Sequence, residues 1–141
     1  LPNGGGHIAR HVYGATVAES IAGLLGNSRT FGHAYNLSQD EEPTLAELVR
    51  MLCDLVGAPV RVASISASLL DKEKILPVAI SPFSTMWMSR IAPAKAKLEL
   101  GFRHPPLRDC LARIVDDFLS HPRSTPPETY ALRKRELELM R

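Results

Sequence analysis

Residues 32–57 constrain the fold of this chain most, because they combine an extended segment, an acidic turn and an amphipathic helix in a fixed order. Residues 34–38 mix apolar and polar side chains, which favours a short strand. The polar run that ends at Pro43 then takes the chain out of extended structure. We therefore expect a strand followed closely by a helix.

The sequence after Pro43 predicts where this helix begins and ends. Thr44 and Glu47 form a capping box, in which hydroxyl and carboxylate satisfy N–H groups that the first helical turn leaves unpaired. Gly57 closes the helix, since glycine enters the left-handed conformation without steric cost. One face is apolar at helical spacing and should be buried: Leu45, Leu48, Val49, Leu52 and Val56.

Other segments predict further helices and strands. Helices are expected over residues 15–25, briefly over 66–71, between Pro93 and Gly101, and from Thr125 onward. The strongest helical stripe consists of Leu107, Cys110, Leu111, Ile114, Val115 and Phe118. Strands are expected at residues 10–13 and 60–65, besides the one at 34–38.

These patterns predict an α/β class, more narrowly a helix-rich α+β domain with a few short strands and about five helices. The 141 residues, of which 45% are hydrophobic, suffice for one core, so residues 1–141 are expected to form a single domain. Residues 122–141 should form a charged terminal helix.

Charge and hydropathy exclude several classes of partner. Seventeen Lys and Arg residues against fifteen Asp and Glu give a net charge of +2, and the charges are interspersed, which argues against a nucleic-acid or anionic-membrane partner. The apolar runs are too short to span a membrane, and the first residues lack the pattern of a signal peptide. We expect a cytoplasmic location, with Cys53 and Cys110 as reduced core residues rather than a disulfide or metal site.

Three blocks of the chain together resemble a known family. Residues 35–48 (Tyr-Asn-Leu-Ser, an acidic turn and Thr-Leu-x-Glu-Leu), residues 10–18 (Arg-His-Val-Tyr, then Val-Ala) and residues 95–102 (Lys-Ala, then Leu-Gly-Phe) carry the likeness. In this order they resemble the carboxyl-terminal half of the NAD-dependent epimerase/dehydratase family, the extended short-chain dehydrogenases. Their arrangement covers roughly the first four-fifths of the chain.

The resemblance implies the substrate-binding half of an NAD(P)-dependent epimerase, dehydratase or reductase that acts on a nucleotide sugar or related small molecule. The Rossmann half, which would hold NAD or NADP and the catalytic Tyr/Lys pair, would precede Leu1 and is an expected partner. This piece alone should then carry no catalytic, cofactor-binding or metal-binding residue and should be inactive. Its apolar side toward the missing half leaves a homo-oligomer possible.

Three residues are candidates for substrate contact. The guanidinium of Arg10 presents a planar fork suited to a diphosphate, and the resemblance places an arginine at this position for that purpose. A surface arginine without such a role is the alternative. Met86 and Trp87 could line an apolar part of the pocket, although such clusters also occur in cores.

Three other patterns are interpreted as coincidental. Residues 4–9 spell a dinucleotide-binding fingerprint, but no strand precedes them to deliver a phosphate-binding turn, so a loop is expected. Tyr130 and Lys134 have the spacing of a dehydrogenase pair, yet they lie in a charged terminal helix. His7 and His11 lack further ligands for zinc.

A second hypothesis follows from departures from the family pattern. Thr16 stands where the family usually has Asp, and Pro82 lies near the place where some sugar epimerases carry a second phosphate-binding arginine. A free-standing, non-catalytic ligand-binding or protein-interaction module derived from such a domain would explain both.

Overall fold

A computed structural model describes residues 1–76, 78, 91–122 and 133–139 of the chain. Met86 and Trp87, and the predicted start of the terminal helix at Thr125, lie outside the described residues. Tyr130 lies outside them as well.

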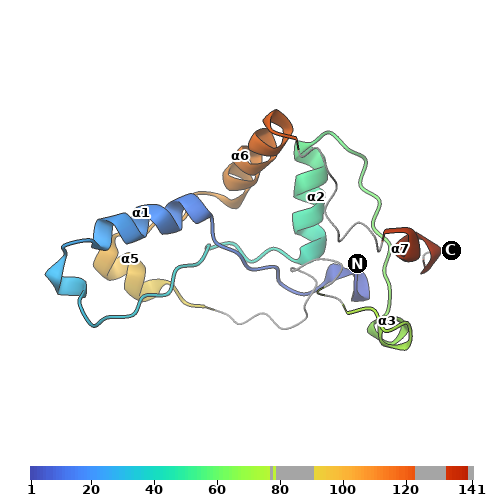
Figure 1. Cartoon of the computed structure of the whole chain (residues 1–141), viewed down its shortest axis with the longest axis horizontal. Helices are drawn as coiled ribbons and strands as arrows, with labels where there is room; N and C mark the ends of the chain where they lie inside the picture. The colour runs from blue at the N-terminus through green and yellow to red at the C-terminus, as the bar shows by residue number, and fades with distance from the viewer. Residues whose placement is uncertain (77, 79–90, 123–132, 140–141) are drawn as a thin grey trace.

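Helices dominate the regular structure of the described residues (Figure 1). Around a central pair, α2 and α6, the view of Figure 1 places α1 and α5 toward one end and α3 and α7 toward the other, with long extended segments between them. The helix-rich part of the predicted fold class is thereby confirmed. The helices are α1 (Gly14–Leu24), α2 (Leu45–Leu55), α3 (Ala67–Lys72), α5 (Ala94–Leu100), α6 (Leu107–Ser120) and α7 (Arg133–Leu139), with 3-10 turns η1 (Asn3–Gly5) and η2 (Ser28–Thr30).

The few expected strands are not observed in the described part of the chain. Its β pairing consists of two isolated bridges, a parallel one between Pro2 and Ile65 and an antiparallel one between Ile8 and Thr44. Residues 10–13 and 34–38 form no ladder of inter-strand hydrogen bonds with other described residues. A strand needs a neighbour whose N–H and C=O groups complete the ladder, and no described segment supplies one beside them.

The capping box of α2 is confirmed in full. The Thr44 hydroxyl accepts the N–H of Glu47 at 3.2 Å, and the Glu47 carboxylate accepts the N–H of Thr44 at 2.7 Å. The N–H and then the hydroxyl of Thr44, which both donate to the Glu47 carboxylate, lower the pKa of Glu47 because they favour the carboxylate form. Gly57 has a φ of 68° after the last turn, and Gly101 has a φ of 66° after α5, as glycines that close a helix do.

Two separate clusters of buried apolar side chains hold the described elements. The larger joins α2 to α6 and to the first segment, and it contains Ala9, Leu45, Leu48, Leu107 and Leu111. The smaller lies around α3 and consists of Ile65, Leu70 and Ile75, with Leu139 of α7 packed against it. An ion pair from Arg135 to Glu73 also connects α7 to the α3 end.

The turn at residues 3–5 is packed, not a free loop. Gly4 and Gly5 both have positive φ, at 73° and 71°, so a side chain would be strained at either position. A Cβ atom added to Gly5 would also lie 2.6 Å from Leu1 Cδ1 and 3.1 Å from the backbone nitrogen of Ala46. Gly5 therefore lets η1 approach the first turn of α2.

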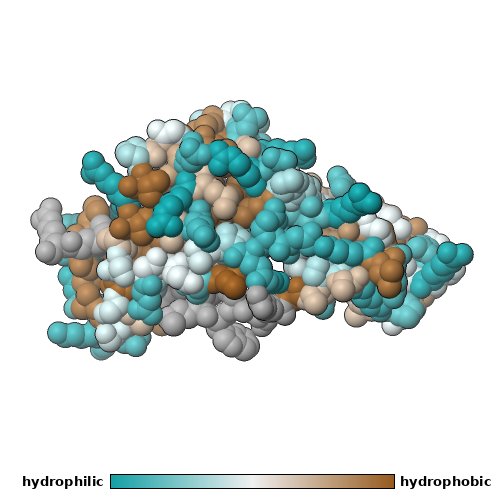
Figure 2. Space-filling model, turned by 180° about the vertical axis from the view of Figure 1, so that it is seen from behind, coloured by the Kyte–Doolittle hydropathy of each residue, from teal (hydrophilic) through white to brown (hydrophobic). Residues whose placement is uncertain are grey.

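Only the first half of the α6 stripe is buried. Leu107, Cys110 and Leu111 are almost inaccessible, whereas Ile114 and Phe118 are 49% and 55% exposed. Figure 2 shows hydrophobic residues beside hydrophilic ones at the upper edge of the molecule, over α6. The stripe therefore predicts the helix correctly but not the extent of its burial.

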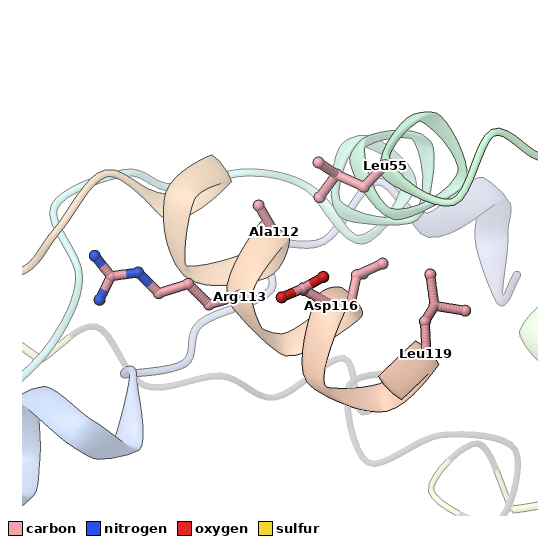
Figure 3. A pocket seen from close by; sticks show the side chains of 6 residues that line it. Leu55, Ala112, Arg113, Asp116 and Leu119 are labelled. Carbon is pink, nitrogen blue, oxygen red and sulfur yellow. The ribbon is translucent and has the colours of Figure 1, made fainter. Parts of the chain in front are cut away.

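A groove of about 440 Å³ lies between the later turns of α2 and α6. Leu55 of α2 faces Ala112 and Leu119 of α6 across it, and Arg113 and Asp116 of α6 also line it (Figure 3). The two helices thus pack closely at their first turns and leave apolar side chains accessible further along.

Replacing Thr44 with Ala should lower the free energy of unfolding by about 1 kcal/mol, because the N–H of Glu47 loses its acceptor. Thr44→Ser is the matched control, since it keeps the hydroxyl. Urea titrations followed by circular dichroism measure both. Equal losses in the two variants would show that the cap does not stabilise the helix.

Replacing Leu111 with Ala should lower the free energy of unfolding by about 2–5 kcal/mol, because this side chain fills the contact between α2 and α6. The same substitution at Leu98 of α5, which is 86% exposed, should change it by no more than about 0.5 kcal/mol. Chemical denaturation compares the pair. Similar losses at both positions would contradict the assigned core.

Candidate functional site

Arg10 lies where three distant segments meet. Its Nη1 donates to the carbonyl oxygen of Ile91 at 3.0 Å, and its Nη2 forms an ion pair with the carboxylate of Glu42. The hydroxyl of Ser38 donates to the same Ile91 oxygen at 2.9 Å. The Arg10 side chain is only 12% exposed, so it is part of a polar junction rather than a free surface residue.

The acidic turn supplies most of this junction. The carboxylate of Glu41 accepts the N–H of Leu107 at 2.9 Å and so holds the start of α6. The side chain of Gln39, which is 2% exposed, donates from Nε2 to the Glu41 carbonyl oxygen at 2.7 Å. Residues 39–42 therefore connect the extended segment at Arg10 with the two central helices.

Two buried polar atoms of the junction have no partner among the described residues. They are the Nε of Arg10 and the Oε1 of Gln39. A buried donor or acceptor without a partner costs free energy unless water or a ligand satisfies it. The junction thus has unused hydrogen-bonding capacity of both kinds.

A pair of histidines borders the junction. The Nε2 of His104 accepts the N–H of Tyr13 at 3.0 Å, and its Nδ1 lies 2.7 Å from the Pro105 carbonyl oxygen, which fits a neutral ring with the proton on Nδ1. Burial and then the neighbouring His104 lower the pKa of His11, while Glu41 acts in the opposite direction. His11 is therefore neutral at pH 7.

The cysteines take no part in this site. Cys53 is partly buried and Cys110 is buried, and both are free thiols. Burial raises the pKa of Cys110, so its reactive thiolate is scarce. Its Sγ lies 3.8 Å from the Pro105 carbonyl oxygen. The prediction that Cys110 occupies an apolar core position is confirmed.

Of the predicted site residues, the structure describes Arg10 alone. Its pairing with Glu42, and the contributions of Ser38 and Gln39, were not predicted. The acidic run at residues 40–42 was a usable signal, since three carboxylates in a turn require cations or N–H groups nearby. The described residues include no helix of the length and apolar character that crossing a membrane requires.

No protein-family model, curated protein or solved structure matches this chain.

When the pH falls below 6.5, the ordinary pKa of a histidine side chain, protonation of His11 should destabilise the folded chain. The pKa of His11 is lower in the folded than in the unfolded chain, so the unfolded chain binds more protons in this range and stability falls as the pH falls. Between about pH 7.5 and about pH 5.5, His11→Asn should lose less stability than the unsubstituted chain. Urea titrations at each pH test this, and parallel losses in both proteins would contradict it.

Proposed function

We propose that this chain is the substrate-binding part of an NAD(P)-dependent epimerase, dehydratase or reductase acting on a nucleotide sugar or related small molecule. The observation that supports the proposal is the position of Arg10. Hydrogen bonds join it to Glu42, inside the second block that carries the resemblance, and to Ile91, which precedes the third block. These contacts support a role in substrate binding for the arginine that the resemblance assigns to a diphosphate.

The chemistry of the junction suits an oxyanion ligand. A guanidinium has five N–H donors, and the described contacts of Arg10 use one on Nη1 and one on Nη2. Glu42 neutralises its charge in the ligand-free chain. A diphosphate would therefore compete with this carboxylate for the guanidinium, and a bidentate pair could replace the single ion pair.

The same proposal assigns the cofactor and the substrate to different parts of the protein. NAD or NADP supplies hydride transfer when bound, and we assign its site and the proton-transfer residues to a part of the protein that precedes Leu1. The present residues would hold and orient the substrate, and we assign them no catalytic role. We also propose a cytoplasmic location, which two free cysteines suit.

Titration of the chain with UDP-glucose, followed by NMR chemical shifts, should give weak saturable binding centred on Arg10. Arg10→Met should abolish it, because the diphosphate loses its cation. Glu42→Gln should tighten it about tenfold, because the competing carboxylate loses its charge. Arg61→Met changes an exposed arginine outside the junction and is the matched control.

Two results would contradict the proposal. One is the absence of saturable shifts with UDP-glucose in both the unsubstituted chain and Glu42→Gln. The other is micromolar binding of NAD(H) to this chain alone, since the proposal assigns the cofactor to preceding residues. The first result would favour the second candidate function.

That second candidate is a free-standing, non-catalytic interaction module. The accessible apolar side chains of α6, namely Ile114, Phe118 and Leu119, favour it, because exposed apolar residues beside a groove are typical of interaction surfaces. The coding sequence upstream of Leu1 distinguishes the two. A glycine-rich strand-turn-helix and a Tyr-x-x-x-Lys there would favour the enzyme, and a start codon after an in-frame stop would favour the module.

A further inference from the structure

A second polar hollow lies between η2, the segment around Tyr35, and α5. It has a volume of about 360 Å³, within the range of roughly 300–1,000 Å³ that is usual for small-ligand sites. None of the described residues that line it belongs to the Arg10 junction. They are Asn27, Arg29, Thr30, Tyr35 and Glu99.

Hydrogen bonds hold both walls of this hollow in place. On one wall, the Asn27 side chain accepts the N–H of Arg29 at 3.2 Å, and the Thr30 hydroxyl donates to the Asn27 carbonyl oxygen at 2.8 Å. On the other wall, the Tyr35 hydroxyl donates to Glu99 Oε2 at 2.8 Å. The side chains of Asn27, Thr30, Tyr35 and Glu99 are therefore positioned before any ligand arrives.

Two opposite charges line the hollow without pairing with each other. Arg29 has no ion pair or side-chain hydrogen bond to any described residue, and Glu99 binds Tyr35 instead of Arg29. An unpaired guanidinium is matched by a carboxylate, which it binds through two parallel N–H donors. The Arg29 wall thus suits an anionic group on the ligand, such as a carboxylate.

The Glu99 wall specifies hydroxyl groups rather than an ammonium. Glu99 Oε2 already accepts the Tyr35 hydroxyl, and its other oxygen can accept a further donor. The ammonium of Lys95 lies 4.7 Å from the centre of the Tyr35 ring and 3.4 Å from His33 Nδ1. A ligand ammonium near Tyr35 would meet this like charge, whereas a neutral hydroxyl would not.

We propose that this hollow binds a small polyhydroxylated carboxylate, of the chemical class of the sugar acids. Its carboxylate pairs with Arg29, and its hydroxyl groups bond to Glu99, Tyr35 and Asn27. The site is independent of the diphosphate junction, since the two share no residue.

The probe is D-glucuronate, titrated into the full chain and followed by NMR chemical shifts. Saturable shifts should be confined to the hollow. Arg29→Gln should weaken binding at least about tenfold, and Glu99→Gln should weaken it about threefold or more. Arg61→Gln, at an exposed arginine away from the hollow, should leave binding unchanged. The positions of the distant amide signals verify that each variant is folded.

Three comparison ligands test the chemical class. D-glucose lacks the carboxylate, acetate lacks the hydroxyl groups, and alanine adds an ammonium, so each should bind at least about tenfold more weakly than glucuronate. The proposal is overturned if glucuronate gives no saturable shifts, if Arg29→Gln binds it as well as Arg61→Gln does, or if any comparison ligand binds equally. UDP-glucose binding is measured from shifts at Arg10, and glucuronate binding is measured from shifts in the hollow. A negative result for one ligand therefore does not affect the conclusion about the other.

Discussion

The contact between the first turns of α2 and α6 positions the rest of the described structure. Leu45 and Leu48 pack there against Leu107 and Leu111. The backbone around this contact also carries the first segment, since the N–H of Leu45 donates to the carbonyl oxygen of His7 and the N–H of Ala9 donates to that of Pro43. Arg10 follows directly, so its place beside the acidic turn is a consequence of this packing.

Features with a local physical cause could be predicted from the sequence. The start of α2 depends on Thr44 and Glu47, and the end of α5 depends on Gly101, so residues a few positions apart decide both. Strands differ, because their bonds come from another segment. Residues 10–13 have a composition suited to a strand, yet the described chain places no complete ladder beside them.

The candidate site was predictable only in part for the same reason. The chemistry of Arg10 was evident from the sequence, but its partner Glu42 is 32 positions away and its other acceptor, Ile91, is 81 positions away. Nothing in a local pattern specifies such pairs. The fold likewise brings Arg29 and Glu99, which are 70 positions apart in the sequence, to the lining of one hollow. Similarly, periodicity located α6 correctly but could not indicate that Phe118 stays accessible.

The division of the buried side chains into two clusters has a consequence for cooperativity. Ile65, Leu70 and Ile75 make their own small cluster with α7, apart from the one between α2 and α6. Because each cluster is stabilised mainly by its own contacts, the α3 end can open while the central helix pair stays folded. We therefore expect heat or denaturant to melt the chain in more than one step, with faster amide exchange around Leu70 than around Leu48.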